Sequence, residues 1–150
     1  MENQRFQDIL ACIPHQSPFR FIDEILELSQ DHIVGAYRYK ADETFYAGHF
    51  PGMPITPGVI LTETMAQIGL VAFGIFLENM RPDQMDQVKV FFTKSDVQFH
   101  KMVLPETRVI VKAEKDFFRL RKLQCRVRME TETGEKIASG VLAGMFAKTS

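Results

Sequence analysis

Residues 56–79 (TPGVILTETMAQIGLVAFGIFLEN) constrain the fold most, because they predict a helix that is apolar on every side. Thr56 is a suitable N-cap and Pro57 suits the first helical position, so we expect the helix to run from there to about Asn79. At 1.5 Å per residue it would be roughly 30 Å long. A helix without a continuous polar face must be buried all round. Its few polar exceptions are Thr62, Glu63, Thr64 and Gln67.

The remainder of the chain predicts strands that can wrap such a helix. A short helix is expected over residues 5–12, and the predicted strands cover residues 19–28, 32–41, 88–101, 107–115, 121–131 and 136–146. In residues 121–131 apolar and polar side chains alternate, which is typical of an antiparallel sheet with one dry face. We therefore predict an α+β fold in which a curled antiparallel sheet surrounds the helix. A second subunit would cover any helix face that the sheet leaves open.

Composition limits the class of protein. The 150 residues are 45% hydrophobic and 25% charged, which predicts one globular domain over residues 1–150. The net charge of -1 excludes a strong overall field for nucleic acid. Cys12 and Cys125 lack metal-ligand spacing, so we expect buried free thiols in a reducing compartment. The first residues do not resemble a secretory signal, and the longest apolar run, residues 68–77, is too short to span a membrane. These features predict a cytoplasmic protein without a membrane segment.

The segment GHFPGMPITPG, residues 48–58, places His49 in an irregular stretch just before the apolar helix. Its neighbours, Gly48 on one side and Phe50 on the other, hold the backbone in a tight segment. An imidazole fixed in this way, with a pKa near neutrality, is the usual general base. The alternative is a structural ring that caps a turn through a hydrogen bond.

Glu63 is the acidic residue within the apolar helix. Burial opposes ionisation of a carboxyl group, and a protonated carboxyl group is a usable acid. Gln67, one turn further on, shares its helix face and could hold it in place. The alternative is that Glu63 lies at a wet interface and pairs with a basic residue.

The start of the helix offers backbone donors. Since Pro57 carries no N–H, the first free amides belong to Gly58 and Val59, at the positive end of the helix dipole. Such a pair can hold an oxygen that gains negative charge, and Gly58 has no side chain to obstruct it. The alternative is an ordinary helix start with solvated amides. Base, acid and oxyanion donors together indicate proton abstraction next to a carbonyl group, with departure of a leaving group.

Two stretches, ILACIPHQSPFRFIDEI and FYAGHFPGMPITPGVILTETMAQ, resemble the signature sequences of the 3-hydroxyacyl-[acyl-carrier-protein] dehydratases of the FabZ type. The resemblance implies the hotdog fold, a curved antiparallel sheet around one long helix, assembled as homodimers and often as trimers of dimers. It places the catalytic histidine on His49, the catalytic glutamate on Glu63 and the amide that binds the thioester carbonyl on Gly58. The two side chains would meet across the dimer interface.

The reaction that the resemblance implies is β-elimination of water from a 3-hydroxyacyl thioester, with acyl carrier protein and its phosphopantetheine arm as the partner. It needs no metal and no cofactor. The sequence departs from the family pattern at Gln16, Ser17 and Arg20, which is compatible with a specialised fatty-acid or polyketide-like pathway. A heteromer with another hotdog subunit also stays open.

His15, a basic stretch and five phenylalanines are further candidates for a structural or a functional role. We expect His15 to be structural, with its ring bonded to the backbone of a Pro-flanked loop. A basic stretch could meet an acidic carrier protein or could be a solvated strand face. Five phenylalanines could line an acyl tunnel or form core. The basic stretch comprises Arg119, Arg121, Lys122, Arg126 and Arg128, and the phenylalanines are Phe91, Phe92, Phe99, Phe117 and Phe118.

Two alternatives to a dehydratase remain at this stage, because a fold alone does not define a function. A hotdog thioesterase would leave His49 without an obvious nucleophilic role. A non-catalytic module that binds acyl thioesters or the acyl carrier would need a tunnel, but it would have no use for a buried acid and a base.

Overall fold

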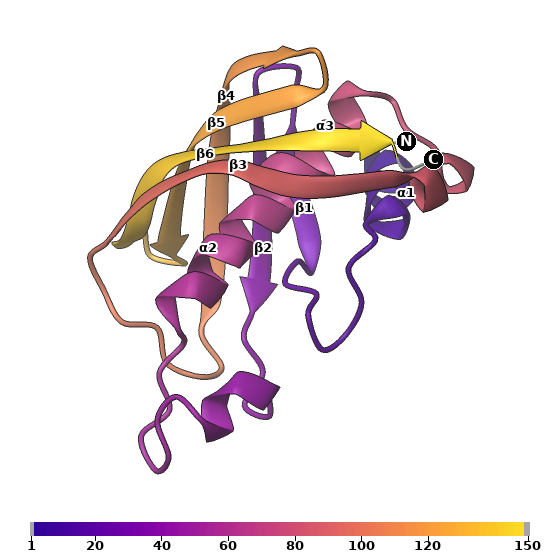
Figure 1. Ribbon diagram of the computed structural model, residues 1–150. Helices are drawn as coiled ribbons and strands as arrows, with labels where there is room; N and C mark the ends of the chain where they lie inside the picture. The colour runs from indigo at the N-terminus through magenta and orange to yellow at the C-terminus, as the bar shows by residue number, and fades with distance from the viewer. Residues whose placement is uncertain (1, 149–150) are drawn as a thin grey trace.

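The computed structural model describes residues 2–148, in which six strands form one antiparallel sheet (Figure 1). The strands pair in the order β1-β2-β4-β5-β6-β3, so β1 and β3 are the two edges. This confirms the predicted α+β fold. The bounds are β1 Glu24–Leu28, β2 His32–Arg38, β3 Val88–Phe99, β4 Arg108–Arg119, β5 Lys122–Thr131 and β6 Lys136–Lys148.

The sheet curls around one central helical segment, which consists of α2 (Gly58–Ala66), η2 (Gln67–Ala72, a π-helical stretch) and α3 (Phe73–Leu77) (Figure 1). Met65, Ile68 and Phe73 on this segment are fully buried. On β5, every second residue from Leu123 to Met129 is buried as well, as the alternation predicts. The sheet and the helix thus share one hydrophobic core. The described residues also form three shorter helices: α1 Glu2–Cys12, η1 Thr44–Ala47 and η3 Pro82–Gln87.

By length and hydropathy alone, the 20 residues from Gly58 to Leu77 are apolar enough to cross a membrane. However, 72% of their most apolar window is buried inside the fold, as expected for the core helix of a sheet-wrapped domain. Gly74 shows how close this packing is. A Cβ atom at this position would lie 2.2 Å from the ring of Phe146 on β6. The absence of a side chain at residue 74 therefore makes room for that ring.

The polar residues of the central helix are accommodated by partners on the sheet and the loops. The Thr64 hydroxyl lies 2.5 Å from the Tyr39 hydroxyl and also donates to the Ile60 carbonyl. The side chain of Gln67 bonds the backbone of the loop before β1. Burial of these groups is tolerated because each has a hydrogen-bond partner. Cys12 and Cys125 are buried free thiols, as predicted, and burial raises the pKa of Cys125 to about 12.

Several element bounds differ by a few residues from the predicted ones, and two of these differences concern the start of β1 and the start of the central helix. The first strand begins at Glu24 rather than at residue 19, because the backbone of Phe19 and Phe21 bonds the side chain of Gln67 and not a neighbouring strand. The central helix begins at Gly58, with Pro57 as its N-cap, so the prediction of Thr56 as N-cap and Pro57 as first helical residue is wrong.

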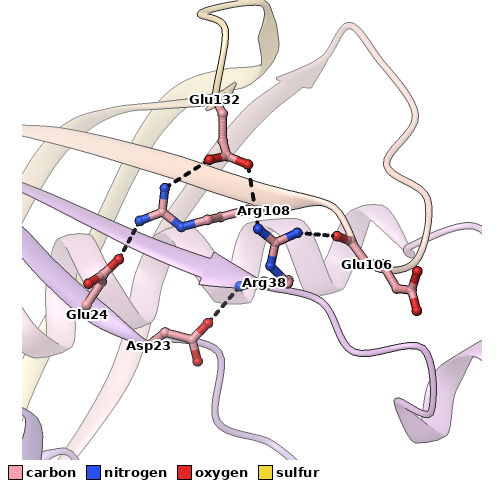
Figure 2. A network of polar contacts seen from close by, with 6 residues as sticks. All are labelled: Asp23, Glu24, Arg38, Glu106, Arg108 and Glu132. Atoms are coloured by element: carbon pink, nitrogen blue, oxygen red, sulfur yellow. Dashed lines mark hydrogen bonds and ion pairs between the residues drawn. The ribbon is translucent and has the colours of Figure 1, made fainter.

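An ion-pair network joins three strands and the turn that follows β5 at one end of the sheet (Figure 2). The Arg108 guanidinium contacts the carboxylates of Glu24 and Glu132, the second at 3.4 Å. Arg38 lies 3.7 Å from Glu132 and donates to the Glu106 carbonyl at 2.7 Å. The network fixes the ends of β1, β2 and β4 beside the turn that follows β5.

The edge strand β3 is long and carries apolar side chains into solvent. It has 12 residues and pairs only with β6, so one side of its backbone has no neighbouring strand within residues 2–148. Phe91, Phe92 and Phe99 are 49%, 42% and 48% exposed. A long apolar edge of this kind is a template for pairing with another strand.

Candidate active site

His49 lies in the loop between η1 and α2, and its ring orientation is fixed by the chain around it. Its Nδ1 atom is 2.9 Å from the carbonyl oxygen of Ile55, and the Ile55 amide donates to the His49 carbonyl. The Phe50 ring stacks on the imidazole with 4.3 Å between centroids, and the peptide bond between the two residues is cis. Because a carbonyl oxygen only accepts, Nδ1 carries the proton of the neutral ring. Nε2 is therefore the nitrogen with a free lone pair.

The start of α2 presents two backbone donors near this loop. The amides of Ile60 and Leu61 both donate to the Pro57 carbonyl, whereas no acceptor for the amides of Gly58 and Val59 lies within the described chain. The two free amides predicted from the sequence are thus present. A Cβ atom on Gly58 would lie 3.3 Å from the Phe99 ring, so the glycine also lets this ring cover the helix start.

Thr56 has a different role from the predicted cap. Its hydroxyl lies 2.6 Å from the Tyr46 hydroxyl, and its amide donates to the Val103 carbonyl. Both side chains of the hydroxyl pair are buried. Since the pair joins η1 to the residue before Pro57, it closes the loop that holds His49.

Glu63 is held by Gln67, as the sequence predicts. Gln67 Nε2 donates to Glu63 Oε2 at 2.9 Å and to the Phe19 carbonyl at 3.0 Å, while its Oε1 accepts from the Phe21 amide at 2.7 Å. The side chain of Glu63 retains 18% of its exposure, so the carboxyl group lies at the margin of the core rather than inside it.

His15 is the residue that the sequence reasoning missed. Its Nε2 atom lies 3.6 Å from Glu63 Oε2, and its Nδ1 atom is buried without a hydrogen-bond partner in the described chain. The expected bond from this ring to the backbone is therefore wrong. Burial lowers the pKa of His15; the Glu63 carboxylate raises it and the Arg20 guanidinium lowers it, and the net shift is downward. The two residues are 48 positions apart, so no local pattern could pair them.

A cavity of about 80 Å³ opens beside the carboxyl group of Glu63. Its polar wall is formed by His15 and Glu63, and its apolar wall includes Leu70 on the central helix. Phe91 and Phe92 line it from β3. Of the other three aromatic candidates, Phe99 covers the helix start, Phe118 packs against the core and Phe117 lies under the Arg119 guanidinium.

The predicted base and acid lie in separate clusters. Within residues 2–148, no hydrogen bond or ion pair joins His49 to Glu63. His49 bonds its own loop, whereas Glu63 bonds Gln67 and faces His15. A single copy of the chain therefore presents two separate clusters. One holds the His49 imidazole and two free amides, and the other holds the Glu63 carboxyl group beside the cavity.

The predicted basic stretch is partly neutralised. Arg126 pairs with Asp116 at 3.0 Å and lies 3.6 Å from Glu114, and Arg128 pairs with Glu130 at 2.6 Å. Two of the five basic residues thus belong to an ordinary ion-paired strand face. The other three, Arg119, Arg121 and Lys122, lie at the β4–β5 turn, where the positive charge is concentrated.

The chain is similar in sequence to known proteins over most of its length. Residues 13–142 match the family model of the FabA-like domain. A 3-hydroxyacyl-[acyl-carrier-protein] dehydratase FabZ of Herpetosiphon aurantiacus is 35% identical over 144 residues, which cover 94% of this chain and 95% of the relative. A FabZ of Chlamydia trachomatis is 38% identical over 110 residues, covering 72% of this chain and 70% of the relative.

Solved structures support the fold at lower sequence identity. The dehydratase heterocomplex ApeI:P from Xenorhabdus doucetiae superposes with a TM-score of 0.72 at 11% identity, over 93% of this chain and 91% of that chain. A hypothetical thioesterase from Streptococcus pneumoniae with coenzyme A superposes with a TM-score of 0.61 at 14% identity, over 84% and 86%. The hotdog fold expected from the two signature stretches is thereby confirmed.

Proposed function

The chain belongs to the family of FabA-like domains, and from this membership we propose that it dehydrates 3-hydroxyacyl thioesters on acyl carrier protein to trans-2-enoyl thioesters. The observation that carries the proposal is the hydrogen bond from His49 Nδ1 to the Ile55 carbonyl. It leaves Nε2 as a directed base, which a module that only binds thioesters would not need.

In the proposed reaction, His49 Nε2 removes a proton from the carbon next to the thioester carbonyl. Negative charge then develops on the carbonyl oxygen. The free amides of Gly58 and Val59 stabilise this oxygen, since they point out of the positive end of α2 and have no competing acceptor in the described chain. Phe50 and Pro57 support the site, the first by stacking on the imidazole and the second by ending the loop at the helix start.

Glu63 acts as the acid. It donates its proton to the 3-hydroxyl group as the bond from carbon to this oxygen breaks. One C–H and one C–O bond are lost, a carbon–carbon double bond forms, and the hydroxyl leaves as water. His49 ends with the proton and Glu63 without it, so a proton returns to Glu63 before the next turnover.

The base and the acid of one site come from two copies of the chain in this proposal. Three features support a homodimer built on β3: the strand is a 12-residue edge, its aromatic side chains are exposed, and Phe91 and Phe92 also line the Glu63 cavity. Two-fold pairing of β3 with its copy would continue the sheet. The same edge would suit a heteromer with another hotdog subunit, and a trimer of dimers would add further contacts.

We further propose that residues 1–150 act as one domain in the cytoplasm, with the phosphopantetheine arm of acyl carrier protein as the vehicle of the substrate. The basic turn between β4 and β5 suits the acidic surface of such a carrier. The departures from the family pattern at Gln16, Ser17 and Arg20 suit an acyl chain of a specialised fatty-acid or polyketide-like pathway.

The test is the absorbance of the conjugated enoyl thioester. Purified protein is mixed with a 3-hydroxyacyl thioester, and separately with its trans-2-enoyl counterpart, each on carrier protein. We expect the band to rise in the first case and fall in the second, and neither change in His49→Ala. Binding of both thioesters without any change in the band would reject the dehydratase in favour of a binding module.

A further inference from the structure

The hydrogen bonds around Gln67 define which oxygen of Glu63 accepts a hydrogen bond. The Phe21 amide can only donate, so the atom that it contacts is the amide oxygen of Gln67. The Phe19 carbonyl can only accept, so the atom facing it is the amide nitrogen. The orientation of Gln67 is thus unambiguous. Its NH₂ group donates to Glu63 Oε2, which therefore serves as an acceptor.

The surroundings of His15 define the tautomer of its ring in a similar way. A neutral imidazole carries one N–H, and that N–H needs an acceptor when it is buried. Nδ1 is buried and has no partner in the described chain, whereas Nε2 faces Glu63 Oε2. The neutral ring therefore carries its proton on Nε2. Burial lowers the pKa of His15, which favours the neutral form.

We infer that His15 is a positioning residue for the acid: when substrate is bound, His15 Nε2–H and Gln67 Nε2–H both donate to Glu63 Oε2, so that the proton of Glu63 resides on Oε1. This inference rests on the proposed dehydration. With Oε2 occupied by two donors, Oε1–H is the only group of the carboxyl that can protonate the departing hydroxyl.

The distance between His15 Nε2 and Glu63 Oε2 is 3.6 Å, longer than a hydrogen bond. Contacts at catalytic sites are often long in the free protein and shorten when substrate binds. The contact therefore shortens when the acyl chain fills the cavity lined by both residues, because exclusion of solvent strengthens polar contacts inside a closed site.

A spectroscopic test does not depend on activity. Long-range ¹H–¹⁵N spectra distinguish the two neutral imidazole tautomers and the imidazolium ion, and His15→Gln and His49→Ala assign the two signals. At neutral pH we expect His15 to carry its proton on Nε2 and His49 to carry its proton on Nδ1, so the second ring is an internal control. A His15 signal from the Nδ1–H tautomer or from the imidazolium ion would overturn the inference.

A kinetic test separates positioning from folding. His15→Gln keeps an N–H donor near the place of Nε2, whereas His15→Leu keeps only bulk. We expect His15→Leu to lower kcat by about 10-fold to 100-fold with KM nearly unchanged, and His15→Gln to recover most of the loss. Equal rates of His15→Leu and wild type, or no advantage of His15→Gln over a folded His15→Leu, would contradict the inference. If the wild type itself fails to turn over any thioester, the proposed function fails, and the tautomer of His15 still decides the geometry.

Discussion

The hydroxyls of Tyr46 and Thr56 lie 2.6 Å apart in the core and join the two ends of the loop that carries His49. The loop is otherwise irregular and lies largely at the surface. Its closure therefore depends on a buried polar contact more than on packed side chains, so a change in this contact should move His49.

Tyr46→Phe removes one partner of this pair and leaves the Thr56 hydroxyl buried without it. We expect unfolding free energy to fall by about 1 kcal/mol, and kcat to fall because the loop loosens. Urea denaturation and steady-state kinetics of Tyr46→Phe, Thr56→Val and the double variant measure the coupling. Strict additivity of the two single effects would show that the hydroxyls do not stabilise each other.

The proposed sharing of one site between two subunits predicts complementation. His49→Ala and Glu63→Gln should each lose several orders of magnitude in kcat. Mixed under conditions of subunit exchange, they should recover about a quarter of the wild-type rate, because half of the dimers are mixed and each mixed dimer has one intact site of two. Native mass spectrometry counts the mixed dimers. Mixed dimers without recovered activity would place base and acid of one site in the same chain.

Packing around Phe146 predicts a large effect of one methyl group. Gly74→Ala would bring a Cβ atom to 2.2 Å from this ring, so we expect a loss of about 1–3 kcal/mol in unfolding free energy. Gly48→Ala is the matched control, since a Cβ atom there meets nothing within 4 Å and its φ of -102° suits alanine. Urea denaturation compares the two. A Gly74→Ala variant as stable as Gly48→Ala would mean that the helix can shift away from β6.

The carboxylate of Glu130 predicts part of the acid sensitivity of the fold. Burial raises its pKa, but hydrogen bonds from Lys112 and Arg128 lower it, and the net shift is below the ordinary value of 4.5. Because the folded protein holds this group ionised, its stabilising effect is present above pH 4.5 and is lost as the pH falls below that value through the folded pKa.

Glu130→Gln should therefore destabilise the protein at neutral pH and flatten the loss of stability on the acid side. Urea denaturation over a pH series measures both effects. Glu114→Gln is a control, since Glu114 is exposed and lies 3.6 Å from Arg126. If Glu130→Gln lost stability at low pH as steeply as the wild type, other carboxylates would be responsible for the pH dependence.

The architecture is readable from the sequence because its signals are local. The apolar helix and the alternation from Leu123 to Met129 each follow from neighbours within one element, and the two elements can only be buried against each other. The free amides at Gly58 and Val59 are local as well, since the first amides of any helix have no carbonyl group one turn before them.

The errors arise where a side chain has two competing partners. Thr56 has the chemistry of an N-cap, but the Tyr46 hydroxyl, ten residues earlier, binds it instead. His15 has the chemistry of a loop ring, but the fold brings it to Glu63. The strand expected from residue 19 is shortened because Gln67 takes its backbone groups. In each case the contact is set by tertiary structure, which propensity and spacing do not contain.

The open edge of β3 has a consequence for the newly made chain. Without a partner strand, each copy carries a twelve-residue strand whose backbone is open on one side and which bears exposed phenylalanines, the combination from which cross-β aggregates grow. In the proposed dimer, rapid assembly after synthesis would thus protect the cell from aggregation. Overproduction without a partner strand, or a substitution that slows pairing, should therefore yield insoluble material even though the core of each copy is fully folded.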